Sequence, residues 1–156
     1  MKILLEQFGL DQGRVALEWV SAAEAPVFVK KITSFTERIC DLGHLGEKEG
    51  LDPVRLQRKI AAARIALEGM KMRSAFARQA KKVKATKSYG EFPDPEKLRA
   101  SLEGEITLQE VFLCLKEERG TAAELSARLD LPEEQVSKAI ETLQKKKKVN
   151  ADRSIS

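Results

Sequence analysis

Hydrophobic and polar positions in the first twenty residues predict a helix followed by a strand. Residues 2–8 carry apolar side chains at helical spacing and precede Gly9, a residue type that is favourable just past a helix end. In the segment VALEWV, residues 15–20, strand formers fall on alternating positions, and a period of two is typical of a strand. A lone strand leaves both of its edges unpaired. We therefore expect Val15–Val20 to pair with a second copy of the chain, as a homo-oligomer, or with another polypeptide, or else to be poorly ordered.

A second helix is predicted after this strand. Ser21 and Glu24 have the spacing of a capping box. Pro26 would remove a hydrogen bond if the helix began at Ser21, so we place the helix start near Glu24 or Ala25. Apolar residues then recur at intervals of three or four up to Gly43, which gives one apolar stripe: Ala25, Phe28, Ile32, Phe35, Ile39 and Leu42. Residues 1–45 thus form a helix–strand–helix unit, which is part of an α/β domain.

The middle of the chain predicts one long basic helix over residues 53–87. Asp52 followed by Pro53 is a favourable helix start. Gly69 is the only strong helix breaker before residue 86, and a single glycine costs about 1 kcal/mol without having to end a helix. Most of the apolar positions in this segment are alanine, isoleucine or methionine.

Residues 98–149 predict a three-helix module with tight turns at Gly120 and at residues 130–131. Two capping boxes of the form T-x-x-E, at Thr107 and at Thr121, mark helix starts, and Pro132 marks a third. The fold class is therefore mainly α, with a partial α/β unit, a long basic helix and a C-terminal module whose spacing is that of a helix-turn-helix.

Charge divides the chain into the same three parts. Residues 1–52 carry 6 basic and 9 acidic side chains, residues 53–87 carry 11 and 1, and residues 88–156 carry 11 and 14. The overall charge of +4 therefore hides a strongly basic middle segment between two acidic ones. Such a segment can lie on phosphates, on an acidic protein partner, or in solvent with its charge partly neutralised by the rest of the chain.

The residue types needed for catalysis or metal binding are sparse. The chain has one histidine and two cysteines, Cys40 and Cys114. Neither cysteine has a second ligand at metal-binding spacing, and both lie on apolar helical stripes, so we expect them to be small core residues. No phosphate loop, catalytic triad or carboxylate pair is recognisable. We expect no catalytic activity of the chain by itself, no cofactor bound by this chain, and a cytoplasmic location, because neither a signal peptide nor an apolar segment long enough to span a membrane is recognisable.

The candidate contact residues are the cations of the middle segment and the polar residues of the last helix. They would contact a partner protein or nucleic acid: Arg55, Arg58, Lys59, Arg64, Lys71, Arg73, Arg78, Lys81, Lys82, Gln135, Lys138 and Lys145.

The segment TAAELSARLDLPEEQVSKAIETLQKKKKV, residues 121–149, resembles the helix-turn-helix core of winged-helix domains. This resemblance implies DNA binding by the last helix. Glu133 and Glu134, however, lie at the end of that helix that meets base edges in such proteins, where carboxylates oppose the phosphate field. A three-helix module that docks a protein is the alternative interpretation.

The first 43 residues resemble the C-terminal end of the methyl-viologen-reducing hydrogenase delta subunit family. The resemblance rests on the stretches LLEQFG, RV and LEWVSA, on Glu24, and on the helix that ends at Leu42 and Gly43. It implies an iron–sulfur protein that links a hydrogenase or formate dehydrogenase to heterodisulfide reductase. The cluster-binding cysteines of that family lie upstream of this stretch and are absent here.

Two functions remain open on the sequence alone. The first is a non-catalytic accessory subunit of a hydrogenase or heterodisulfide reductase type of electron-transfer complex, which docks through the basic helix and the C-terminal module. The second is a nucleic-acid-binding transcriptional regulator that uses the helix-turn-helix.

Overall fold

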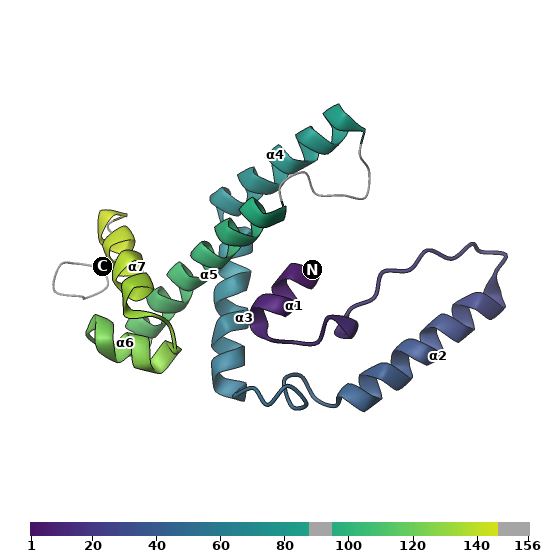
Figure 1. Ribbon diagram of the computed structural model, residues 1–156, viewed down its shortest axis with the longest axis horizontal. Helices are drawn as coiled ribbons and strands as arrows, with labels where there is room; N and C mark the ends of the chain where they lie inside the picture. The colour runs from purple at the N-terminus through teal and green to yellow at the C-terminus, as the bar shows by residue number, and fades with distance from the viewer. Residues whose placement is uncertain (88–94, 147–156) are drawn as a thin grey trace. The chain divides into compact units, whose positions relative to one another are not determined.

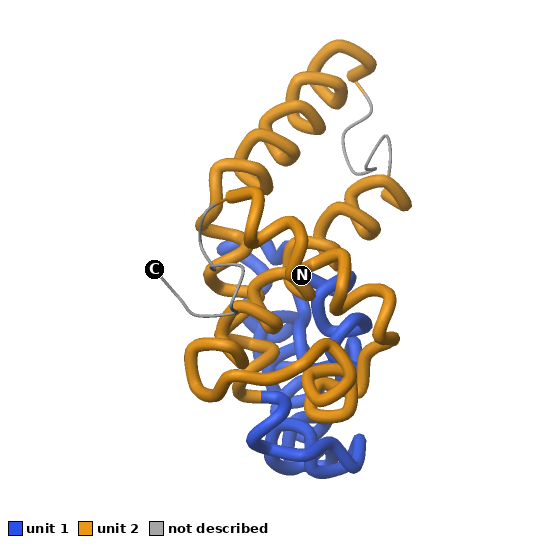
Figure 2. The backbone as a smooth tube through the Cα atoms, turned by 90° about the vertical axis from the view of Figure 1, so that its left-hand side faces the viewer, with its two compact units in different colours: residues 1–56 blue, residues 57–156 orange. Residues whose placement is uncertain are grey.

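The computed structural model of the chain describes residues 1–87 and 95–146. All regular elements in these two ranges are helical (Figure 1). The chain divides into two compact units, residues 1–56 and residues 57–156 (Figure 2). Each unit is described by itself below.

Unit 1 contains α1 (Lys2–Phe8), the short 3₁₀ helix η1 (Gln12–Arg14) and α2 (Ala25–Leu42). The predicted strand is wrong. Residues 15–20 connect η1 to α2 without regular structure, so the described part of unit 1 has no sheet and is not a partial α/β unit. Figure 1 shows this connection as an extended strip of chain between η1 and α2.

The absence of a strand has a simple physical reason. Val15 has the extended backbone of a strand, with φ −133° and ψ 127°, as its residue type favours. A strand, however, exists only when a neighbour accepts and donates its backbone hydrogen bonds, and no described segment lies beside residues 15–20 in that way. Local preference therefore gives the extended conformation, and the lack of a partner prevents the sheet.

Local capping signals correctly predict the helix ends of unit 1. Gly9 closes α1 in the left-handed conformation, with φ 74°. The Ser21 backbone N–H donates to Glu24 Oε2 over 3.1 Å, and α2 begins at Ala25 with Pro26 in its first turn, where a missing N–H costs nothing.

The long basic helix is interrupted, contrary to the prediction. It consists of α3 (Pro53–Glu68) and α4 (Met70–Thr86). Gly69 has an extended backbone, with φ −69° and ψ 146°, and a Cβ at this position would lie 3.0 Å from the Ala66 carbonyl oxygen. The glycine lies between the two helices, and a side chain at this position would require the neighbouring backbone to shift by a few tenths of an ångström.

Unit 2 ends in three helices, α5 (Pro95–Glu117), α6 (Ala122–Leu129) and α7 (Glu133–Lys145). The capping box at Thr121 is confirmed: its hydroxyl accepts from the Glu124 N–H over 3.2 Å, and Glu124 Oε2 accepts from the Thr121 N–H over 2.7 Å. The box predicted at Thr107 is wrong, because this residue lies inside the continuous helix α5.

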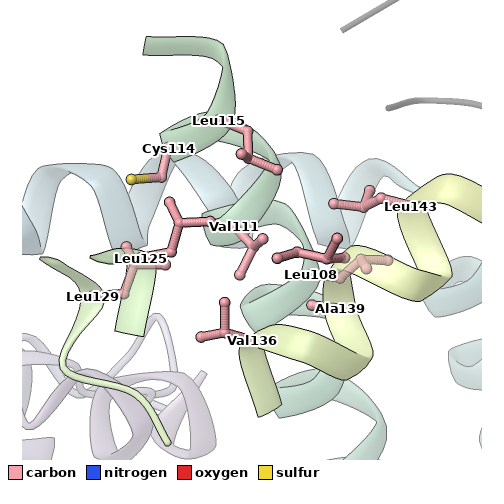
Figure 3. Close-up of a cluster of buried hydrophobic side chains, with 10 residues drawn as sticks. Leu108, Val111, Cys114, Leu115, Leu125, Leu129, Val136, Ala139 and Leu143 are labelled. Atoms are coloured by element: carbon pink, nitrogen blue, oxygen red, sulfur yellow. The ribbon is translucent and has the colours of Figure 1, made fainter. Parts of the chain in front are cut away.

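These three helices enclose the main hydrophobic core of unit 2 (Figure 3). Leu125, Val136 and Leu143 are completely buried, as is Val111, and each helix contributes at least one of these side chains. Leu131 and two further half-buried apolar residues pack against the cluster. The helix-turn-helix spacing seen in the sequence therefore corresponds to a packed three-helix arrangement.

Candidate docking surfaces

The helix α2 has an apolar surface that unit 1 does not cover. Among its larger apolar side chains, Phe28 is 54% exposed, Val29 60% and Ile32 50%. The only residue that α2 buries is Leu42, at its C-terminal end. A helix with a wide apolar stripe normally buries that stripe against another element, so α2 has the sequence of a packed helix and the exposure of an unpacked one.

The connection between η1 and α2 extends this apolar surface. Leu17 is 82% exposed and Trp19 is 87% exposed. A groove of about 810 Å³ lies between this connection and α2. Its apolar lining comes from both sides: Ala16, Leu17, Val20, Val27, Phe28, Ile32 and Phe35.

One ion pair ties the connection to α2 beside this groove. The Lys31 ammonium binds the Glu18 carboxylate, and this hydrogen bond lowers the pKa of Glu18 below its ordinary value. Both side chains are at least one-third exposed, so the pair contributes little to stability. The pair joins Glu18 of the connection to Lys31 of α2.

Arg14 fixes the other end of α2. Its guanidinium donates to the carbonyl oxygens of Leu42, Gly43 and His44 over 2.9, 3.1 and 3.0 Å. The last carbonyls of a helix have no partner within the helix, and they attract cations through the helix dipole. Arg14 therefore caps α2 from a position 28 residues away.

Glu49 completes this clamp. Its two carboxylate oxygens accept from Arg14 Nε over 2.7 Å and from Nη2 over 2.9 Å, and Oε1 also accepts from the Asp11 N–H over 2.9 Å. The bidentate pair is strong because both partners are charged and planar. It lowers the pKa of Glu49 to about 2, and both side chains are nearly buried. We call Arg14 and Glu49 the polar clamp.

Several predicted contact cations of unit 2 are paired with carboxylates of the same unit. Arg58 contacts Glu117 at 3.1 Å, and Arg64 contacts Glu68 at 3.2 Å. Arg55, Arg58 and Lys59 are partly buried, whereas the remaining predicted cations of α3 and α4 are exposed: Arg64, Lys71, Arg73, Arg78, Lys81 and Lys82. Part of the basic charge is thus neutralised within unit 2.

Three predicted contact residues come together at a polar groove of unit 2. Lys71, Gln135 and Lys138 line a cavity of about 420 Å³ that is formed by α4, α5 and α7. The nearly buried Glu105 carboxylate lies in its wall, 2.9 Å from Lys71 Nζ and 3.9 Å from Lys146 Nζ. Lys71 and Lys146 both lie close to Glu105, and Lys138 pairs with Glu134, so the cations of this groove are largely neutralised. Lys145 does not line it and is exposed.

The first turn of α7 is acidic, as the sequence indicated. Glu133 and Glu134 both lie there, and Glu134 Oε1 contacts Lys138 Nζ at 2.6 Å. This contact raises the pKa of Lys138 and lowers that of Glu134. Lys138, one of the residues predicted to contact nucleic acid, therefore already has a carboxylate partner.

The two cysteines differ in their surroundings. Cys114 is 2% exposed in the core of unit 2, as predicted. Cys40 is exposed, so the prediction that it is a core residue is wrong. It lies beside Thr33, Thr36 and Glu37, on another face of α2 than the apolar stripe.

The residues present do not fit an iron–sulfur cluster. Such clusters are held by four thiolates, and the chain has two cysteines, one of which is buried among apolar side chains. Within residues 1–87 and 95–146, no group of three His, Cys, Asp or Glu side chains is placed to hold a metal ion. No helix of the same described ranges is long and apolar enough to cross a membrane.

Comparison with known protein families gives one finding, which concerns unit 1. Residues 1–43 match the family model of the methyl-viologen-reducing hydrogenase, delta subunit. No curated protein and no solved structure matches the chain. The matched range ends with α2 and its last capping residue, Gly43, and so it contains the exposed apolar surface described above.

The sequence reasoning missed the polar clamp and the exposure of α2. Arg14 belongs to the stretch on which the family resemblance rests, but its role depends on Glu49, which lies 35 positions away. An arginine directly before an apolar segment and a glutamate in a glycine-rich loop were the available signals. No pattern in the sequence signalled the exposure of α2.

Proposed function

We propose that the chain is a non-catalytic subunit of a hydrogenase type of electron-transfer complex and that it acts by docking other subunits through unit 1. Its partners are redox subunits of the hydrogenase or heterodisulfide reductase type. One observation carries this proposal: the segment that matches the delta-subunit family contains a helix, α2, on whose apolar stripe Phe28 and Ile32 are about half exposed. An exposed apolar patch of this kind marks a protein interaction site more often than an accident of folding.

A docking role is also consistent with the residues that are missing. An electron carrier needs a cluster or another redox group, and the two cysteines do not provide one. In the proposed complex, other subunits carry the electrons, and this chain holds subunits together in the cytoplasm. The exposed cations of α4 offer a second contact area for an acidic subunit, since complementary charge steers association.

The proposal is tested by isolating the tagged chain from its native cells without oxygen. We expect the purified material to reduce methyl viologen with hydrogen and to contain redox subunits in a fixed ratio to the chain. Mass spectrometry identifies the subunits, and the dye assay shows that they are active. Recovery of the chain without redox subunits, or with nucleic acid alone, would contradict the proposal.

A matched pair of variants links this result to α2. Ile32→Asp places a charge in the apolar stripe, whereas Thr33→Asp places the same charge on the neighbouring exposed position of the same helix. We expect Ile32→Asp to lose most of the associated hydrogenase activity and Thr33→Asp to retain it. Equal retention by both variants would show that α2 is not the docking surface. Iron analysis of the chain purified alone should give much less than one iron per chain.

A further inference from the structure

The apolar stripe of α2 has the spacing of a coiled-coil seam. Its six members are separated by three, four, three, four and three residues: Ala25, Phe28, Ile32, Phe35, Ile39 and Leu42. This is a heptad repeat with apolar residues at both seam positions. In an amphipathic helix that covers a globular core, the stripe is usually wider and less regular. The regular seam therefore favours a helix as the element that covers it.

The length of α2 agrees with this interpretation. Its 18 residues correspond to about 27 Å, or about two and a half heptads. In the exposed part of the seam, Phe28 and Ile32 are each about half exposed. Both also line the groove beside the connection, so a helix seated on the seam would at the same time cover Leu17.

Cations flank this seam. Lys31 and Arg38 occupy the heptad positions next to the seam, and Lys30 also lines the groove. Lys31 is engaged by Glu18. For Lys30 and Arg38, the described residues show no ion pair. Flanking charges of a coiled coil select the partner through interhelical salt bridges, so a basic rim favours an acidic partner.

A second copy of α2 is a poor occupant. In an antiparallel pair, Lys31 and Arg38 of one copy would face the same two cations of the other, and like charges across an interface are unfavourable. In a parallel pair, Lys31 would face Thr36 and Arg38 would face Gly43 of the other copy, and neither offers a charge. Neither arrangement satisfies the basic rim.

We propose that α2 and the connection before it bind an amphipathic helix of another polypeptide, one with a heptad apolar seam and acidic residues beside that seam. This proposal rests on the docking function and specifies the chemistry of the partner. The helix lies along Phe28, Ile32 and Phe35, and its carboxylates pair with Arg38 and compete with Glu18 for Lys31.

The test uses two synthetic peptides of about three heptads. Both have Leu and Ile at the seam positions; one has Glu at all flanking positions and the other has Lys. Each peptide repels its own copies, which keeps it monomeric. Trp19 is the only tryptophan in the chain and is 87% exposed, so its emission will shift to shorter wavelength when a helix covers the surface. We expect the full-length chain to bind the Glu peptide at least about tenfold more tightly than the Lys peptide at low salt.

Charge reversal provides the decisive variant. The variant Arg38→Glu should remove this preference or reverse it in favour of the Lys peptide. Thr33→Glu is the matched control, since it adds a carboxylate to α2 away from the groove, and it should keep the preference for the Glu peptide. Circular dichroism verifies that all variants are equally helical. A preference that is independent of the rim charges would overturn the proposal, as would equal affinity for both peptides or no binding of either.

Sedimentation of the chain without peptide tests the competing occupant. A dimer that Ile32→Asp dissociates would assign the surface to a second copy and overturn the proposal. The peptide experiment can fail while the chain still co-purifies with active hydrogenase, in which case only the chemistry of the partner is wrong. Conversely, the peptide could bind while no redox subunit co-purifies with the chain. That outcome would support the helix-binding site and refute the hydrogenase-type function.

Discussion

Units 1 and 2 both contain helices with an apolar face, but they differ in how far that face is buried. In unit 2, the apolar faces of α5, α6 and α7 close on each other, and Val111, Leu125 and Leu143 are completely buried. In unit 1, the buried apolar cluster contains only Leu5, Leu10 and Leu56, and the apolar face of α2 remains exposed. The comparison indicates that unit 2 obtains its stability from its own core. Unit 1 depends on the polar clamp, and the exposed part of its α2 stripe is available for binding a partner.

The largest expected effect tests the core of unit 2. Leu143→Ala removes a completely buried side chain of α7, and such truncations cost about 2–5 kcal/mol because a cavity remains. We expect the free energy of opening, measured by amide hydrogen exchange, to fall by this amount in residues 95–146 and to stay unchanged in residues 1–56. Hydrogen exchange followed by mass spectrometry separates the two units. Accelerated exchange throughout the chain would show that the units do not unfold separately.

An intermediate effect is expected for the polar clamp of unit 1. Glu49→Gln removes the charge from a nearly buried bidentate pair and should lower the free energy of unfolding of unit 1 by about 1–3 kcal/mol at neutral pH. Because the folded pKa of Glu49 is about 2, below the ordinary value of 4.5, the contribution of the carboxylate is complete above pH 4.5. It is lost as the pH falls from 4.5 toward 2.

The pH dependence gives this prediction its control. In that acidic window, the unaltered chain should lose stability in residues 1–56 more steeply than Glu49→Gln, as measured by hydrogen exchange at each pH after correction for the intrinsic rate. Glu18→Gln is the matched variant, because Glu18 also has a lowered pKa but lies in an exposed pair. It should follow the unaltered chain closely. Equal pH profiles for all three proteins would mean that the clamp does not stabilise unit 1.

The smallest effect is expected for the exposed seam. Ile32→Ala truncates a side chain that is 50% exposed, and substitutions away from a core usually change stability by less than about 0.5 kcal/mol. We expect thermal unfolding of the isolated chain to be almost unchanged, in contrast to Leu143→Ala. A loss comparable to that of Leu143→Ala would show that the isolated chain buries α2 in solution and would remove the contrast between the units.

The sequence predicted best where neighbouring residues determine the structure. The helix start at Ala25 follows from Pro26, which fits the first turn of a helix, and the start after Thr121 follows from capping side chains within three residues of the backbone groups that they bind. The same holds for the left-handed turn at Gly9. These interactions need no knowledge of the rest of the fold, which is why the pattern alone identifies them.

The predictions failed where distant residues decide. The strand Val15–Val20 needed a pairing partner, and no described segment provides one. The T-x-x-E pattern at Thr107 has the right local chemistry but lies within α5, where the backbone already forms helical hydrogen bonds and needs no cap. The break at Gly69 and the exposure of Cys40 likewise depend on what approaches the backbone or covers the helix, and a spacing pattern does not contain this information.

The candidate site was predicted only in part. The match of residues 1–43 agrees with the resemblance seen in the sequence. The expected contact cations are divided between ion pairs within unit 2 and exposed positions on α4, and only Lys71, Gln135 and Lys138 meet in one groove. The surface that carries the proposed function is instead the apolar stripe of α2, because exposure is a property of the folded chain.

The unequal burial of the two cysteines gives the protein a natural chemical handle. A thiol-reactive dye added to the folded chain meets the exposed sulfur of Cys40, whereas Cys114 is shielded by the packed side chains of three helices. Labelling at a single position therefore requires no engineered residue. The dye will lie on the face of α2 that carries Thr33 and Thr36, so a label can follow the protein without blocking the apolar stripe.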